Sequence, residues 1–214
     1  MSELEKILED VRPLADRLWG QLAVLRREYD RPRIMVAGAE PGVGNTLVCA
    51  ATALGLARNL RQEVRLIETN LARPGLADLL EVPRGPGLSD VLDHRATLDQ
   101  AFQRLTSCPD LGVIAAGSPR SVLPGEFATE EVRTLLAEAS AGADFTILDA
   151  APIPSREGSR LLLDAVDGIV LVVRARSSRI EGVREAMEIA ETAGVPIIGS
   201  VLNRYKSDVP FGLD

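Results

Sequence analysis

Short apolar runs alternate along the chain with longer amphipathic stretches. The runs are rich in β-branched residues and are largely apolar on both faces, which is typical of strands buried on both faces. They cover 34–37, 64–67, 112–115, 145–148, 169–173 and 196–202. Helical periodicity marks 46–61, 98–106, 127–140 and 180–193. Regular alternation of strand and helix predicts an α/β fold of three layers, a mostly parallel sheet with helices on both faces.

A separate helical segment is predicted ahead of this pattern. Leucines recur at helical spacing over residues 3–29, and Pro13 should kink or divide the helix. We therefore divide the chain into an N-terminal helical segment, 1–30, and one α/β domain, 31–214. The helix either packs on its own domain or binds a partner.

Composition and charge exclude several classes of protein. A net charge of −7 argues against a surface for nucleic acid or anionic membrane. No apolar run approaches the ~18 residues of a membrane span, and the N-terminus lacks the order of a secretory signal. Two distant cysteines, Cys49 and Cys108, and a single histidine exclude a zinc finger or a disulfide framework. These features predict a cytoplasmic protein whose cysteines are reduced core residues.

A glycine-bearing loop joins the first predicted strand to its helix. In that position, backbone N–H groups and the helix N-terminus form the phosphate cradle of a P-loop. Thr46 is placed to bind Mg²⁺. The predicted contacts to ATP or ADP come from Pro41, Gly42, Val43, Gly44, Asn45 and Thr46.

The loop lacks the lysine that the P-loop motif requires, because Asn45 stands there. That lysine normally reaches the β- and γ-phosphates and supports the transition-state charge. Losing such a contact costs on the order of 10²–10³ in rate. The only lysines, Lys6 and Lys206, lie at the two ends of the chain. Arg73 is a candidate substitute, although a guanidinium is not equivalent to an ammonium. A retained loop scaffold is favoured over nucleotide chemistry.

Three segments in order carry a family resemblance. They are Pro41-Gly42-Val43-Gly44, the run 87–92 (GLSDVL) and the run 145–152 (FTILDAAP). Together they resemble the bacterial tyrosine kinases, cytoplasmic kinase domains tied to polysaccharide co-polymerases, over residues 14–205. The parent ParA/MinD superfamily shares the loop and the strand that ends at Asp149, but the run 87–92 favours the kinase branch.

The resemblance implies roles for three further residues. Asp149 would be an acid of the magnesium shell together with Thr46. Glu68 would be the surviving first acid of a catalytic Asp-x-Asp motif. Asn203 matches a position near the adenine.

The departures from the family concern one chemical task. The second acid of the motif is replaced by Asn70, which cannot act as a base. The second lysine of the ParA/MinD branch falls at Glu40. Family kinases end in a tyrosine cluster, whereas the only tyrosines here are Tyr29 and Tyr205. The family's ring-assembly motif, Glu-x-x-Arg-x-x-Arg, has no clean match, so homo-oligomerisation stays open.

Loss of loop lysine, paired acid and tyrosine tail together favours a pseudokinase. The resemblance then implies a protein of exopolysaccharide or capsule synthesis or export, acting as regulatory or scaffold partner of a membrane co-polymerase. It would sit at the bacterial inner membrane through that partner and bind ATP or ADP with Mg²⁺ weakly or not at all. One alternative is an active ATP-dependent tyrosine autokinase or ATPase. A second is a ParA/MinD-type positioning ATPase, which the absence of both lysines weakens.

Overall fold

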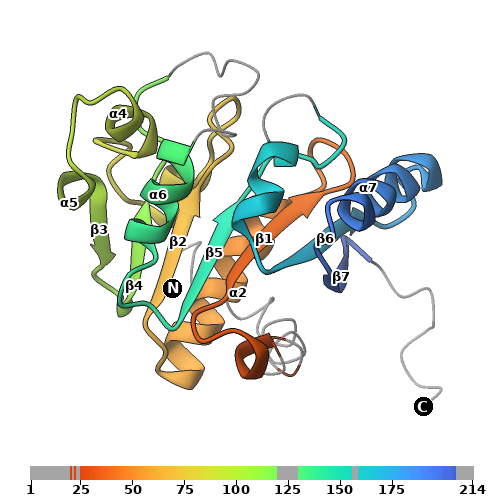
Figure 1. Ribbon diagram of the computed structural model, residues 1–214, viewed down its shortest axis with the longest axis horizontal. Helices are drawn as coiled ribbons and strands as arrows, with labels where there is room; N and C mark the ends of the chain where they lie inside the picture. The colour runs from red at the N-terminus through yellow and green to blue at the C-terminus, as the bar shows by residue number, and fades with distance from the viewer. Residues whose placement is uncertain (1–19, 21, 23–24, 120–129, 156–158, 206–214) are drawn as a thin grey trace.

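The computed structural model describes residues 20, 22, 25–119, 130–155 and 159–205 (Figure 1). Within these ranges the strands form one seven-stranded sheet of order β3-β4-β2-β5-β1-β6-β7. All neighbours are parallel except β3 and β4. The six predicted apolar runs all lie in parallel strands, so the mostly parallel sheet is confirmed. The strands are β1 (Arg33–Gly38), β2 (Val64–Glu68), β3 (Phe102–Leu105), β4 (Cys108–Ile114), β5 (Phe145–Asp149), β6 (Gly168–Arg174) and β7 (Ile197–Asn203).

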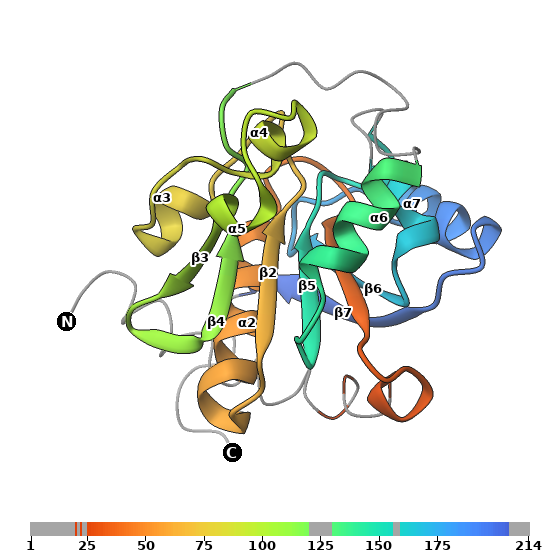
Figure 2. The same cartoon turned by 60° about the vertical axis from the view of Figure 1, so that its left-hand side comes forward.

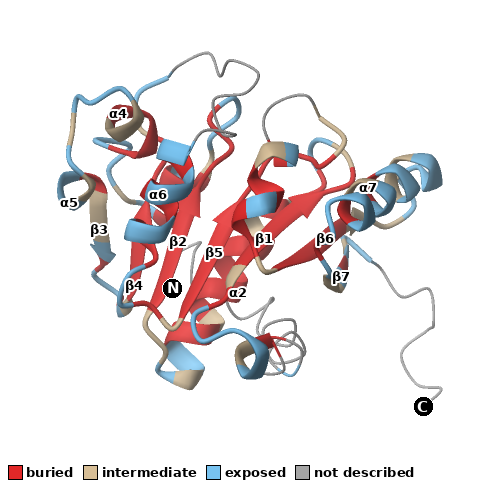
Figure 3. Cartoon of the chain, viewed as in Figure 1, coloured by how far each residue is buried: buried red, intermediate tan, exposed pale blue. Residues whose placement is uncertain are grey.

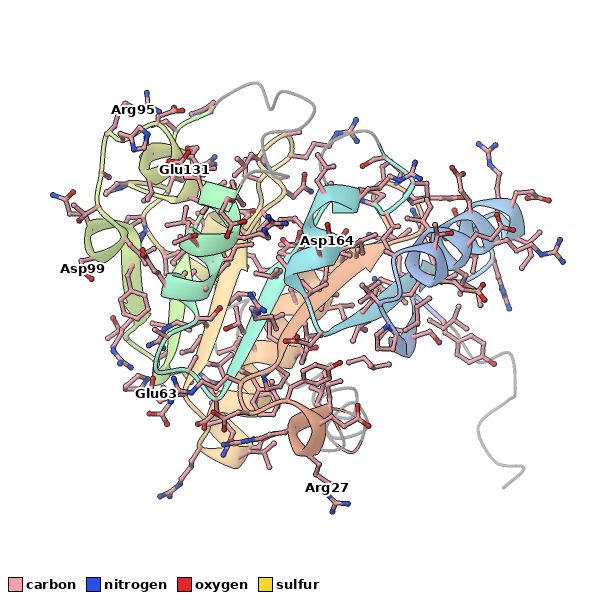
Figure 4. All side chains as sticks on the ribbon, in the orientation of Figure 1. Arg27, Glu63, Arg95, Asp99, Glu131 and Asp164 are labelled. Atoms are coloured by element: carbon pink, nitrogen blue, oxygen red, sulfur yellow. The ribbon has the colours of Figure 1, made fainter. Side chains whose placement is uncertain are left out.

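Helices cover both faces of this sheet, as the alternating pattern predicts. Helix α2 (Asn45–Leu60) lies on one face, and α6 (Glu130–Ala139), the 3₁₀ helix η2 (Ser159–Ala165) and α7 (Ile180–Thr192) lie on the other (Figure 1). Each face buries its own apolar cluster. The central strands β1, β2, β4, β5 and β6 are mostly buried (Figure 3), whereas the edge strands β3 and β7 are largely intermediate or exposed. Charged side chains such as Arg27, Asp99 and Glu131 lie exposed on the outside (Figure 4).

Three further short helices lie in the chain between β2 and β3. They are α3 (Leu76–Leu80), α4 (Leu88–Leu92) and α5 (Leu98–Ala101). Helix α4, formed by the GLSDVL run, lies at the end of the sheet to which the parallel strands point (Figure 2). None of the helices in the described ranges is long and apolar enough to cross a membrane.

The predicted helix over 98–106 is wrong beyond its first turn. The chain leaves α5 at Ala101 and pairs antiparallel with β4, with Phe102 opposite Ile114. The apolar spacing of residues 98–106 fits a helix, but contacts with residues distant in the sequence favour a strand. A Cβ at Gly112 would lie 2.3 Å from the Phe102 ring, so the glycine makes room for that ring. The guanidinium of Arg65 lies over the Phe102 ring, with its carbon 4.7 Å from the ring centroid.

The predicted N-terminal helix lies mostly outside the described residues. Its described end is helical, and Leu22 and Leu25 are buried in the same cluster as α2. Arg26 forms an ion pair of 2.7 Å with Asp144, just before β5. This end of the segment therefore packs on its own domain.

Strand register brings the predicted site residues to one edge of the sheet. Asp149 at the end of β5 is the register partner of Val36 in β1 and of Glu68 in β2. The loop that follows β1 therefore begins next to the ends of the two strands that carry the acids. This confirms the predicted placement of the loop and of Asp149.

Candidate phosphate-binding site

The loop between β1 and α2 depends on two glycines with left-handed backbone. Gly42 has φ +76° and Gly44, the N-cap of α2, has φ +92°. Asn203 at the end of β7 donates a 2.7 Å hydrogen bond from Nδ2 to the Val43 carbonyl. A Cβ at Gly44 would lie 2.3 Å from that same nitrogen. Asn203 therefore supports the loop, and its contact with adenine stays a prediction.

Glu40, at the position of the ParA/MinD second lysine, is turned toward α7. Its Oε1 accepts a 2.8 Å hydrogen bond from the backbone N–H of Arg179, the N-cap of α7. A Cβ at Gly182 would lie 3.3 Å from the same oxygen, so the carboxylate sits at the first turn of that helix. A negative charge there stabilises the helix dipole.

Asn45, at the position of the loop lysine, is directed into the protein. The residue is 7% exposed. Its Nδ2 donates hydrogen bonds of 2.9 Å to Asp149 Oδ1 and 2.7 Å to the Ala150 carbonyl. Both donors of the side-chain amide thus tie the start of α2 to the end of β5.

Asp149 is fully buried beneath the loop. Besides Asn45, the thiol of Cys49 contacts Oδ1 at 3.5 Å, whereas Oδ2 has no hydrogen-bond partner among the described residues. Burial raises the pKa of Asp149 to about 7; a hydrogen bond from Thr46 opposes the rise and the charge of Glu68 adds to it. The carboxyl is thus partly protonated near neutral pH.

The two cysteines are free and buried, as predicted. Burial raises the pKa of Cys49 well above its ordinary value, and the neighbouring Asp149 adds to the rise. A thiol in this state is unreactive. Its contact with Asp149 was missed by sequence reasoning, although Cys49 lies one helical turn after Asn45 and so on the same side of α2.

Glu68 is engaged by three backbone N–H groups. The side chain is 1% exposed. Its Oε1 accepts from Gly75 at 2.5 Å and from Leu76 at 2.8 Å, and its Oε2 accepts from Ala116 at 3.0 Å. The carboxylate therefore anchors the start of α3 to the chain that follows β4. The structure brings it beside Asp149 but commits both of its oxygens, and its catalytic role stays a prediction.

A cavity of about 320 Å³ opens in front of the loop. Asn70 lines it, is 8% exposed, and has an Oδ1 atom without a hydrogen-bond partner in the described ranges. Ser155, which no sequence signal marked, also lines it, and its hydroxyl has no hydrogen-bond partner among the residues that the structure describes. Cavities of roughly 300–1,000 Å³ hold small molecules. The lining residues are Pro41, Gly42, Gly44, Asn45, Thr46, Asn70, Arg73, Pro152 and Ser155.

The oxygen atoms near Thr46 are ligands of the kind that a magnesium ion prefers. Mg²⁺ prefers hard oxygen ligands. The Thr46 hydroxyl interacts with the carboxyl of Asp149, and the unpartnered oxygens of Asp149 and Asn70 are acceptors of the required kind. These three residues would hold the ion.

Taken together, the loop after β1, the helix that follows and the acid at the end of β5 define a P-loop nucleotide-binding fold in which asparagine replaces the loop lysine. No family model matches the chain. It is 28% identical over 174 residues to the tyrosine-protein kinase YwqD of Bacillus subtilis. The aligned region covers 81% of this chain and 72% of YwqD. It is also 28% identical over 176 residues to the tyrosine-protein kinase Etk of Escherichia coli. That aligned region covers 82% of this chain but 24% of Etk.

Solved structures agree with these sequence relatives. The kinase domain of Escherichia coli Etk superimposes with a TM-score of 0.78 at 26% identity, covering 96% of this chain and 80% of that domain. The cell-division protein MinD from Pyrococcus horikoshii, solved with Mg-ADP, shares the fold at a TM-score of 0.67 and 24% identity, covering 82% of this chain and 71% of MinD. The resemblance is thereby confirmed: the homologues are bacterial tyrosine kinases, and the structural neighbours include MinD-type P-loop ATPases.

Proposed function

We propose that this protein is a kinase-like binding protein without phosphoryl-transfer activity, a pseudokinase that serves as regulatory or scaffold partner in exopolysaccharide or capsule synthesis or export. The observation that carries the proposal is the pair of hydrogen bonds from Asn45 to Asp149 and Ala150. The position that should direct a cation at the phosphates instead holds two elements of the domain together.

The remaining groups of the site lack the chemistry of phosphoryl transfer. That reaction depends on positive charge around the transferred group and on a base or orienting residue for the nucleophile. The carboxylate of Glu68 is occupied by three backbone donors, and Asn70 is a neutral amide. The described part of the site therefore supports binding better than catalysis.

Nucleotide is proposed to bind weakly rather than to react. The N–H groups of the loop and the N-terminus of α2 would receive the phosphates. Thr46, Asp149 and Asn70 would hold Mg²⁺, which neutralises phosphate charge when it is bound.

The proposed partner is a membrane co-polymerase, which would keep this protein at the cytoplasmic side of the inner membrane. Support comes from the relatives, which are tyrosine-protein kinases, and from the sequence resemblance, which implies such a partner. The N-terminal helix is the proposed contact. Because Leu22 and Leu25 belong to the core, a deletion that tests this contact must stop at residue 19. We expect that deletion to abolish co-polymerase binding and to leave cooperative unfolding intact; retained binding would place the contact elsewhere.

Incubation with labelled ATP and Mg²⁺ tests the loss of activity. We expect Tyr29 and Tyr205 to stay unlabelled. Robust labelling that Asp149→Ala abolishes would instead establish an active autokinase. That alternative would require a substitute for the missing lysine, and Arg73 is the charged residue among those described at the phosphate cavity.

A further inference from the structure

We propose that Arg73 is the phosphate-binding cation of this site, so that nucleoside di- and triphosphates are held from the β2–α3 segment as well as from the loop. This inference deepens the proposed function, because it rests on nucleotide binding without phosphoryl transfer.

The segment that carries Arg73 is held against the loop at both ends. At its start, the backbone N–H groups of Thr69 and Asn70 donate to the Asp149 carbonyl at 2.9 and 3.1 Å. At its end, Glu68 accepts from Gly75. A Cβ at Gly75 would lie 4.0 Å from the Thr46 methyl group, so the segment runs beside the first turn of α2.

Arg73 itself is exposed at the cavity and uncommitted. A turn positions it, because its backbone N–H donates to the Asn70 carbonyl at 3.3 Å. Within the described ranges its guanidinium has no ion pair or hydrogen bond, whereas the exposed Arg84 is paired with Asp78 at 2.6 Å. Among the described lining residues, Arg73 is also the one that carries a charge. The cavity therefore presents a net positive side chain to a ligand.

The rest of the lining forms a built polar site. Helix α2 has 16 residues and directs its N-terminus at the cavity, where anions are stabilised. Asn70 is more than nine-tenths buried, yet within the described part of the chain neither its Oδ1 nor the hydroxyl of Ser155 has a hydrogen-bond partner. A buried polar group without a partner is costly unless a ligand or water satisfies it. Both groups line the cavity that Arg73 borders.

The chemistry of a guanidinium suits a bound phosphate chain. Its planar fork donates two parallel hydrogen bonds to phosphate oxygens, and it stays charged at every accessible pH. Because Arg73 comes from a different segment than the loop lysine, it supplies affinity for phosphate without restoring the arrangement that transfers it. We expect ligands with two or three phosphates to bind better than AMP.

Calorimetric titration of the full chain with ADP and with pyrophosphate, with and without Mg²⁺, tests the inference. Arg73→Gln should weaken both ligands by roughly ten- to hundredfold, the usual range for losing hydrogen bonds to a charged group. Arg73→Lys should retain part of the affinity. Arg84→Gln is the matched control, since it also removes one exposed positive charge, and it should change affinity less than about twofold.

Two results would overturn the inference: an Arg73→Gln variant that binds ADP as the unaltered protein does, or an unaltered protein that binds neither ADP nor pyrophosphate. Thermal unfolding of each variant confirms that the exposed substitution leaves the domain folded. The proposed function fails separately, by transfer of label from ATP to tyrosine, and ADP cannot report on that step.

Discussion

The side-chain amide of Asn45 donates a 2.9 Å hydrogen bond to the carboxyl of Asp149, a residue 104 positions further along the chain. In a P-loop enzyme the first of these positions holds the lysine that contacts the phosphates, and the second holds the acid of the magnesium shell. Here the pair joins the start of α2 to the end of β5. The site thus has the backbone arrangement of a P-loop, but a neutral amide stands where the lysine would supply a positive charge.

Restoring the loop lysine should improve binding but not catalysis. We expect Asn45→Lys to raise ATP affinity by about tenfold or more, because it supplies an ammonium for the phosphates where the present amide is directed at Asp149 and Ala150. Labelling of Tyr29 and Tyr205 should stay absent, because Asn70 is still unable to act as a base. Calorimetry and labelled ATP measure the two effects, and Arg58→Lys, at the far end of α2, controls for a lysine elsewhere on the same helix. Phosphorylation restored by the single change would contradict the pseudokinase.

Glu68→Gln should lower stability whether or not nucleotide is present. The buried carboxylate accepts hydrogen bonds from three backbone N–H groups. The NH₂ group of a glutamine would face one or more of these N–H groups and could not accept from them. The expected loss is about 2–4 kcal/mol in the free energy of unfolding, read from urea denaturation. Asp78→Asn breaks an exposed ion pair and should cost less than about 1 kcal/mol. Equal stability of the two variants would show that Glu68 is free for another role.

The buried carboxyl of Asp149 should make stability depend on pH. Its pKa is about 7 in the folded protein against 3.8 for an ordinary aspartate, so the folded state binds more protons between these values. The stabilisation is complete below about pH 4 and is lost as pH rises through about 7. Between pH 5 and pH 8, the unaltered protein should lose roughly 2–3 kcal/mol relative to Asp149→Asn. Parallel stability profiles of the two proteins would refute the raised pKa.

Glu40→Lys, which restores the second lysine of the ParA/MinD branch, should destabilise the domain. It removes the acceptor for the Arg179 N–H and places a positive charge at the N-terminus of α7, at a cost of about 1 kcal/mol. Glu40→Gln, which keeps an acceptor and loses the charge, should fall between the two. Thermal unfolding measures the effect. ATP-driven dimerisation of Glu40→Lys would favour the positioning ATPase instead.

Local patterns in the sequence were sufficient for most of the fold. Parallel strands inside a sheet that is covered on both faces are largely apolar, and this marked the six parallel strands. Helical periodicity marked α2 and α7. The loop was equally legible, because Gly42 and Gly44 adopt positive φ that other residues rarely tolerate. The apolar run 145–148 likewise placed Asp149 at the end of its strand.

The tertiary structure decided the rest, because each remaining feature depends on atoms far away in the chain. Residues 102–105 have a helical pattern and become a strand only because β4 offers them an edge and the space at Gly112. The resemblance predicts Glu68 as a catalytic acid, and only the tertiary structure shows that it also accepts a hydrogen bond from Ala116, 48 residues on. Asn45 could be recognised from the sequence as a missing lysine. That its amide would bind Asp149 follows only from the packing of α2 against β5, which no spacing of residues along the chain encodes.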